Sequence, residues 1–235
     1  MAKYSSEDVR ENCREVFFRV GEAAARSGRS PQDIQIMAVT KTVPPDLVNV
    51  AIEEGISLLG ENRVQEFLGK ESFYHLEKAK VHFIGHLQTN KVKAIIEKVD
   101  MVQSLDSLRL AQQIDRAAAE AGRVMEVMVE VNIGREASKS GILPEETAEF
   151  LEQIAGFPAL RVRGLMCIPP QISENPENLH FFENMAQLFI DMRDKKIDNV
   201  DMDFVSMGMS SDYAAAIEAG ANLVRIGTAL FGKRG

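Results

Sequence analysis

The sequence contains no tryptophan, only two cysteines and fewer basic than acidic residues. Cys13 and Cys167 are too few for the disulfide framework of a small secreted domain and are typical of a reducing cytoplasm. With 27 basic and 35 acidic residues the net charge is −8, which argues against nucleic acid as a partner because phosphate neutralisation requires a basic surface. No apolar run approaches the roughly 18 residues of a membrane span, and the N-terminus lacks a signal-peptide pattern. We therefore expect a cytoplasmic protein that binds neither nucleic acid nor membrane.

Several motifs that would assign a chemistry are also missing. No glycine-rich dinucleotide fingerprint, P-loop or G-x-S-x-G sequence occurs. His82 and His86 lie four residues apart, but no Cys, Asp or Glu cluster accompanies them, so the sequence predicts no metal site.

Along its length the sequence alternates between helical and strand-like patterns. Residues 5–27 carry apolar positions at helical spacing, and Pro31 prevents their helix from continuing. Short apolar runs then alternate with helical segments, as parallel strands buried on both faces would. The predicted strands are 34–39, 56–60, 81–85, 101–105, 124–132, 160–168, 204–207 and 222–227, and the clearest predicted helices are 107–121, 144–154 and 179–192.

This alternation predicts an α/β fold, a single closed (β/α)8 TIM barrel that spans residues 1–235. The strands recur about every 27 residues, the size of a βα unit. The chain stops shortly after the last strand, which predicts that no eighth helix follows it and that an extra N-terminal helix within residues 1–30 packs into the gap. Residues 169–178 are the best candidate for a mobile loop. Because a closed barrel has no free sheet edge, we expect a monomer.

The barrel rule places the active site at the carboxyl ends of the strands, where Lys41 follows the first strand. The residues before it are apolar or small, so its side chain begins inside the barrel mouth. Burial disfavours the ammonium form and yields a nucleophilic amine that can form a Schiff base with an aldehyde. The alternative is a solvated lysine that begins a loop.

The loops after the seventh and eighth strands carry a second candidate. Ser206–Asp212 and Gly227-Thr228 offer hydroxyl groups and backbone amides, and barrels often bind phosphate at these two loops. Helix capping by Ser210 or Ser211 is the alternative interpretation. Arg225, within the eighth strand, requires an acceptor, which is either an acidic side chain in the barrel or an atom of a ligand.

These residues belong to seven segments that resemble one family. In this sequence the segments read A-V-T-K-T (38–42), G-E-N-R-V-Q-E (60–66), H-F-I-G-H-L-Q-T-N-K (82–91), V-N-I-G-R-E-A-S-K-S-G (131–141), R-G-L-M-C-I-P-P (163–170), S-M-G-M-S-S-D (206–212) and V-R-I-G-T-A-L-F-G (224–232). The chain closely resembles the pyridoxal 5′-phosphate (PLP) homeostasis proteins, single-domain relatives of the N-terminal barrel of alanine racemase. One departure is Val81, where relatives often have tryptophan.

The resemblance implies a PLP site and a role for each matching residue. Lys41 would form the internal aldimine, Arg225 would face the pyridine nitrogen, and Asn62 and Met207 would lie near the ring. Ser210, Gly227 and Thr228 match the phosphate-binding positions. His82 belongs to the matching motif, but strand alternation does not decide whether it or His86 faces the cofactor.

Three functions are compatible with this site. The first is a carrier that holds PLP on Lys41, takes part in vitamin B6 homeostasis and supplies apo-enzymes. The second is an amino-acid racemase, which needs an acid/base group on each face of the substrate carbon. None of Tyr4, Tyr74 and Tyr213 occupies an expected second-base position, and 235 residues leave no room for a second domain to supply one. The third is a phosphosugar enzyme with a Schiff-base lysine. We expect the carrier, with no catalytic residue.

Overall fold

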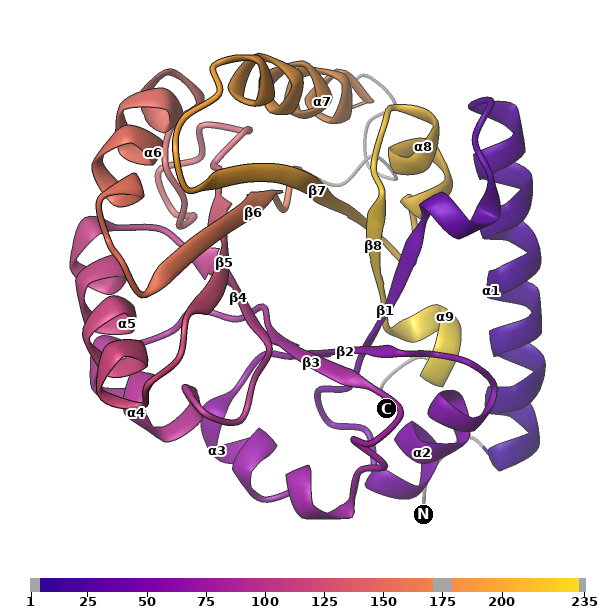
Figure 1. Ribbon diagram of the computed structural model, residues 1–235. Helices are drawn as coiled ribbons and strands as arrows, with labels where there is room; N and C mark the ends of the chain where they lie inside the picture. Colours follow the sequence, from indigo (N-terminus) through magenta and orange to yellow (C-terminus); the bar gives the residue numbers. More distant parts are fainter. Residues whose placement is uncertain (1–4, 171–178, 233–235) are drawn as a thin grey trace.

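Eight parallel strands close into a barrel in which each strand pairs with the next and β8 pairs with β1 (Figure 1). The computed structural model describes residues 5–170 and 179–232. The strands are β1 (Gln35–Val39), β2 (Leu58–Glu61), β3 (Lys80–Phe83), β4 (Met101–Leu105), β5 (Met125–Glu130), β6 (Leu160–Met166), β7 (Val200–Met209) and β8 (Leu223–Ile226). The predicted (β/α)8 barrel is confirmed.

A ring of helices surrounds the strands, and each strand is followed by at least one helix. The α-helices are α1 (Ser6–Arg26), α2 (Pro45–Glu53), α3 (Val64–Leu68), α4 (Val92–Ile95), α5 (Leu108–Glu120), α6 (Thr147–Ala155), α7 (Leu179–Asp194), α8 (Tyr213–Glu218) and α9 (Thr228–Phe231). Short 3-10 turns lie at Pro31–Asp33, Glu71–Phe73, Thr89–Lys91 and Pro144–Glu146. Most of the predicted mobile loop, residues 171–178, lies outside the described residues.

The N-terminal helix α1 takes the place of an eighth outer helix. It begins with a capping box, in which the Asp8 amide donates to Ser5 Oγ (3.2 Å) and the Ser5 amide donates to Asp8 Oδ2 (2.7 Å). Its buried face, which includes Val9, Cys13 and Val16, packs against α2, α8 and α9 (Figure 1). The sequence predicted no helix after the last strand, whereas the structure has a single turn there, α9. One turn is too short to cover the gap, so α1 covers it.

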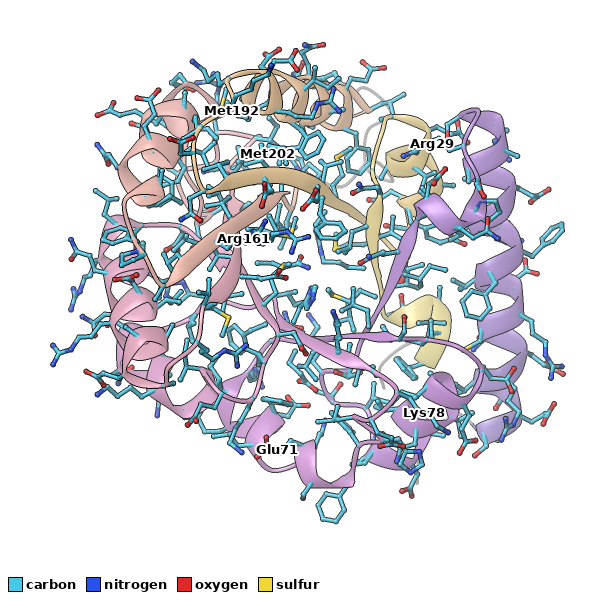
Figure 2. The ribbon with its side chains drawn as sticks, viewed as in Figure 1. Arg29, Glu71, Lys78, Arg161, Met192 and Met202 are labelled. Atoms are coloured by element: carbon cyan, nitrogen blue, oxygen red, sulfur yellow. The ribbon has the colours of Figure 1, made fainter. Side chains whose placement is uncertain are left out.

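Arg29 fastens the segment after α1 to the barrel. Figure 2 shows Arg29 beside α8, where its guanidinium donates to the carbonyl oxygens of Ala221 (2.9 Å) and Ile217. The Ile217 carbonyl belongs to the last turn of α8 and the Ala221 carbonyl follows that helix, so a cation is favourable there.

The seventh strand is longer than the sequence predicted because polar residues interrupt its apolar pattern. β7 begins at Val200, four residues before the predicted start at Phe204. Asp201 and Asp203 occupy this first part and pair with Arg161 and Arg163 of β6, each at 2.7 Å. Cross-strand ion pairs therefore replace the apolar side chains that strand prediction relies on.

Apolar side chains fill two separate layers. Inside the barrel, Met37, Val39, Leu58, Ile84 and Leu223 form one cluster, and three methionines of β4, β5 and β6 form another. The larger core lies between the strands and the helices. Within the described ranges, no helix combines the length and hydropathy that crossing a bilayer requires.

Candidate functional site

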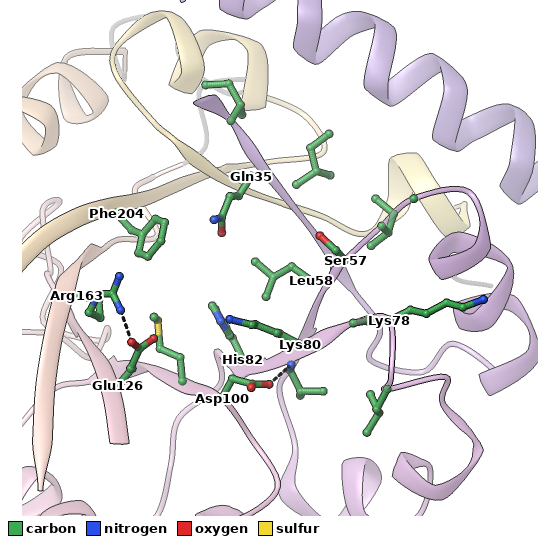
Figure 3. Close-up of a pocket in the computed structure, with 18 of the residues that line it drawn as sticks. Gln35, Ser57, Leu58, Lys78, Lys80, His82, Asp100, Glu126, Arg163 and Phe204 are labelled. Carbon is green, nitrogen blue, oxygen red and sulfur yellow. Dashed lines mark hydrogen bonds and ion pairs between the residues drawn. The ribbon is translucent and has the colours of Figure 1, made fainter. Parts of the chain in front are cut away.

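The barrel has a cavity at each end, and the one at the carboxyl ends contains most of the residues that the sequence singled out. The larger, of about 1200 Å³, opens at the amino ends of the strands, where Lys80, His82, Glu126 and Arg163 face it (Figure 3). Its Arg163 is already paired with Glu126 and Asp203. The smaller cavity, of about 260 Å³, opens at the carboxyl ends, where barrels of this type carry out their chemistry.

The carboxyl-end cavity brings together six of the eight predicted site residues. Its walls are Val39, Lys41, Asn62, Ile84, Ile168, Met209, Ser210, Ser211, Arg225, Gly227 and Thr228. Lys41, Asn62, Ser210, Arg225, Gly227 and Thr228 are the predicted ones. An amine, a guanidinium and several hydroxyl groups therefore share one space with the apolar side chains of Val39, Ile84 and Ile168. We call it the Lys41 pocket.

The backbone on both sides of Lys41 is held by buried or partly buried carboxylates. Thr40 is fully buried, and its Oγ1 donates to Glu61 Oε1 at 2.7 Å. Thr42 has a φ of 64°, an outlier for a β-branched residue, and its amide donates to the Glu66 carboxylate. Such a conformation persists only where its surroundings enforce it, so these contacts fix the position of the Lys41 backbone.

Glu61, which accepts the hydrogen bond from Thr40, also contacts the helical segment after β2. It is fully buried, and its Oε1 also accepts a hydrogen bond from Tyr74 Oη at 2.9 Å. Burial raises the pKa of Glu61, and the hydrogen bonds from Thr40 and Tyr74 act in the opposite direction. Its Oε2 has no hydrogen-bond partner in residues 5–170 and 179–232. Glu61 precedes Asn62 in the chain, so one carboxyl group positions two walls of the pocket.

Asn62 lines the pocket, and its backbone lies close to the backbone of Gly85. A Cβ atom at Gly85 would lie 2.1 Å from the Asn62 carbonyl oxygen, so only glycine permits this contact. Ser104 Oγ donates to the Gly85 carbonyl at 2.6 Å and holds the segment from the other side. The Oδ1 atom of Asn62 is buried and has no hydrogen-bond partner among the described residues, an unusual state for a polar atom in a native fold.

Ser210 joins the loops after β7 and β8. Its Oγ accepts hydrogen bonds from the amides of Gly227 (3.0 Å) and Ala229 (3.2 Å). Because both bonds use the oxygen as acceptor, the hydroxyl hydrogen remains able to donate to an anion in the pocket. Asp212 closes the same loop by accepting from the Met209 amide at 2.7 Å.

Arg225 projects from β8 into the barrel interior and is only 4% exposed. Its Nη1 donates to Ser206 Oγ at 2.6 Å and its Nη2 to the Cys167 carbonyl at 2.7 Å. Burial lowers the pKa of Arg225, and Cys167, Glu130 and Asp212 counteract that effect. Among the described residues no carboxylate forms an ion pair with it. Arg225 therefore donates to neutral oxygen atoms of Ser206 and Cys167 instead of to the acidic side chain that was one of its two predicted acceptors.

The structure places the other two predicted residues outside the pocket. Met207 is buried in the core between the strands and the helices. His82 lies deeper in the barrel, with Nδ1 2.9 Å from Gln103 Nε2, and faces the amino-end cavity. His86 is largely exposed and lies 3.6 Å from an Asp106 oxygen. Neither histidine lines the Lys41 pocket.

The buried position of His82 predicts a pH dependence of stability. Burial lowers the pKa of His82 from 6.5 to about 3, so the folded protein binds fewer protons than the unfolded chain between these values. Stability should therefore fall as the pH drops below 6.5. Relative to His82→Gln, the wild-type protein should lose about 2 kcal/mol of unfolding free energy between pH 7 and pH 5, as measured by urea denaturation. A constant difference would contradict the assignment.

Some residues of the site were not predicted from the sequence. Glu61 and Glu66 lie in the G-E-N-R-V-Q-E segment, and an acidic residue at the end of an apolar strand was a detectable signal. Met209 and Ile168 line the pocket as side chains next to predicted ones. In the described part of the chain, no group of three potential ligands could hold a metal ion.

Comparisons with known proteins agree on one family. The model of the alanine racemase N-terminal domain matches residues 22–235. A pyridoxal phosphate homeostasis protein from Aquifex aeolicus is 41% identical over 225 residues, which cover 95% of this chain and 97% of that protein.

Solved structures are similar to this chain either in both sequence and fold or in fold alone. PipY from Synechococcus elongatus, with PLP bound, superposes with a TM-score of 0.77 at 30% identity and covers 91% of this chain and 100% of its own. Alanine racemase from Corynebacterium glutamicum has a TM-score of 0.75 at 16% identity, over 97% of this chain and 62% of that enzyme. The second likeness concerns the fold alone.

Proposed function

The chain belongs to the pyridoxal phosphate homeostasis proteins of the alanine racemase N-terminal domain family, and on that premise we propose that it binds PLP in the Lys41 pocket and serves as a PLP carrier. The motif resemblance is confirmed by the family match. The observation that supports the proposal most is that Lys41, Ser210 and Arg225 line one cavity at the carboxyl end of the barrel.

The residues of the pocket suit the chemical groups of PLP. Lys41 offers an amine to the aldehyde, and Ser210, Thr228 and the Gly227 segment offer hydroxyl groups and amides to the phosphate. The buried Asn62 Oδ1 lacks a partner within the part of the chain that the structure describes, and a hydroxyl group of a ligand would supply one. When bound, PLP supplies an aldehyde that reacts with amines and a ring that withdraws electrons.

Each residue has a distinct role in this proposal. Lys41 holds PLP covalently as an aldimine, in a position fixed by the Glu61 and Glu66 contacts. Ser210 donates its hydroxyl hydrogen to the phosphate. Arg225 donates to the pyridine nitrogen and keeps that nitrogen unprotonated, because a guanidinium does not give up its proton. Val39, Ile84 and Ile168 exclude water from the ring.

A carrier fits this arrangement better than a racemase. A ring whose nitrogen faces arginine is a weaker electron sink than a protonated ring. Racemisation also needs a second acid/base group, and neither tyrosine in the described ranges lines the pocket: Tyr74 is bound to Glu61, and Tyr213 is buried at the start of α8. The curated relative matches over almost its entire length and is named as a homeostasis protein.

Reduction with borohydride tests the site. The PLP-loaded protein is expected to have a visible absorption band, and borohydride should abolish the band and leave a pyridoxyl group on Lys41. Peptide mass spectrometry locates the adduct. A pyridoxyl group on another lysine, or none at all, would refute the assignment.

Exchange in deuterated water separates the carrier from the racemase. The loaded protein is incubated with single L-amino acids, and deuterium at Cα and the D-isomer are measured. We expect no sustained turnover, because none of the described residues that line the pocket is a second acid/base group placed opposite Lys41. Turnover at ordinary enzymatic rates would exclude the carrier. Transfer of PLP to an added apo-enzyme, followed by recovery of that enzyme's activity, is the direct assay of carrier function.

The phosphate contact predicts the effect of Ser210→Ala. The variant loses the hydroxyl donor and the acceptor that joins two loops, so the Kd for PLP should rise about 10- to 100-fold. Ser107→Ala is the matched control, because Ser107 caps α5 away from the pocket. Equal affinities for PLP in both variants would exclude Ser210 as a phosphate ligand.

A further inference from the structure

The Arg225 guanidinium is the end of a chain of buried polar side chains that crosses the barrel. Ser206 Oγ, which accepts from Arg225 Nη1, lies 2.8 Å from Gln103 Oε1, and Gln103 Nε2 lies 2.9 Å from His82 Nδ1. The four residues come from β8, β7, β4 and β3 and are at most 5% exposed. The chain therefore links the Lys41 pocket to the wall of the amino-end cavity, where Figure 3 shows His82.

The chemistry of Arg225 determines which group donates and which accepts in each hydrogen bond of this chain. A guanidinium only donates, so Ser206 Oγ accepts and must direct its own hydrogen to Gln103 Oε1. That contact orients the Gln103 amide with its nitrogen toward His82 Nδ1, which must then be unprotonated. Burial lowers the pKa of His82 to about 3, in agreement with a neutral ring that carries its proton on Nε2.

Among the described residues, Ser206 is the only one whose side chain accepts a hydrogen bond from Arg225. Its second acceptor, the Cys167 carbonyl, is a backbone atom, and no carboxylate of the described residues forms an ion pair with it. Ser206 can rotate its hydroxyl, so it holds Arg225 in one orientation only while Gln103 accepts its hydrogen. Gln103 is fully buried and does not line the Lys41 pocket.

We propose that Gln103 is a positioning residue, which acts through Ser206 to aim the Arg225 guanidinium into the Lys41 pocket. The effect on bound PLP rests on the proposed function, whereas the effect on Arg225 and His82 does not. A merely structural role would be satisfied by any side chain that fills the same space.

Two variants of Gln103 separate positioning from packing. Gln103→Met keeps the length of the side chain and removes both hydrogen bonds. Gln103→Glu keeps the acceptor for Ser206 but also presents an acceptor to His82, which must then become a donor. If Gln103→Met does not fold, Ser206→Ala breaks the next link of the same chain and replaces it in the experiment.

The first readout uses the protein without PLP. In ¹⁵N NMR spectra the Arg225 Nη hydrogens should be resolved in the wild-type protein and in Gln103→Glu, and averaged by rotation in Gln103→Met. His82 should carry its proton on Nε2 in the wild-type protein and gain a proton on Nδ1 in Gln103→Glu. An Arg225 side chain that remains immobilised in Gln103→Met would overturn the proposal.

The second readout uses the PLP-loaded protein. Gln103→Met should shift the maximum of the visible band and its pH midpoint and raise the Kd for PLP about tenfold, the loss of roughly one hydrogen bond. Gln103→Glu should restore most of this affinity. A Gln103→Met variant that unfolds more easily but keeps the wild-type band and Kd would show a structural role only. If neither the wild-type protein nor any variant binds PLP, the proposed function is wrong. The NMR readout on the protein without PLP still decides the role of Gln103.

Discussion

Lys41→Ala is expected to remove the visible band of the PLP-loaded protein completely and to weaken PLP binding on the order of 100-fold or more, because only non-covalent contacts remain. The unfolding free energy should change by about 1 kcal/mol or less, since Lys41 is partly exposed at the barrel rim and contributes little to the core. Absorbance titration with PLP and urea denaturation measure the two effects.

Two further variants make this result specific. Lys41→Arg keeps the positive charge at the position but cannot form the same bond with an aldehyde, so its visible band should also be absent. Lys93→Ala is the matched control, since Lys93 is an exposed lysine paired with Glu120 and should retain the wild-type band. A normal band in Lys41→Ala would mean that PLP reacts elsewhere in the chain.

Gly85→Ala is expected to destabilise the fold by about 3 kcal/mol and to impair PLP binding as well. The added Cβ would lie 2.1 Å from the Asn62 carbonyl oxygen and 2.8 Å from its carbonyl carbon and Cα. These are backbone atoms, so the end of β2 must move to make room. Asn62 and the neighbouring Glu61 would move with it. Urea denaturation measures the first effect and PLP titration the second.

The matched control for this variant is Gly69→Ala. Gly69 ends α3 with a φ of −80°, and its added Cβ would lie no closer than 3.5 Å to another atom. We expect a change in unfolding free energy within about 0.5 kcal/mol and unchanged PLP affinity. If both glycine variants behaved alike, the close approach at Gly85 would not support the pocket.

Most of the fold could be predicted because its signal is local and repeated. Each βα unit carries its own apolar strand and amphipathic helix, so an error in one element does not change the overall pattern. Prediction was least accurate at the start of β7, where Asp201 and Asp203 are stabilised by arginines of a neighbouring strand. A single strand does not reveal such a partner.

The site residues, too, were predictable where their signal is local and not where it depends on side-chain direction. Lys41, Ser210 and Arg225 could be identified because Lys41 and Ser210 follow strands, Arg225 lies within one, and all three carry reactive or anion-binding groups. His82 and Met207 share the same motifs but lie outside the pocket, since motif membership does not determine which way a side chain points. Six predicted residues line the cavity; their assignment as PLP ligands is a proposal.

The sequence by itself determined the barrel, its family and the end of the barrel where the reactive lysine lies, because these depend on periodicity, composition and short motifs. Only the tertiary structure decided how the lysine and arginine are held. Thr40 meets Glu61 across 21 positions of the chain, and Ser206 meets Gln103 across 103. Formation of the barrel brings these side chains into its buried interior, where a polar group without a partner costs free energy. Such partners are selected by three-dimensional proximity, which no local pattern in the sequence encodes.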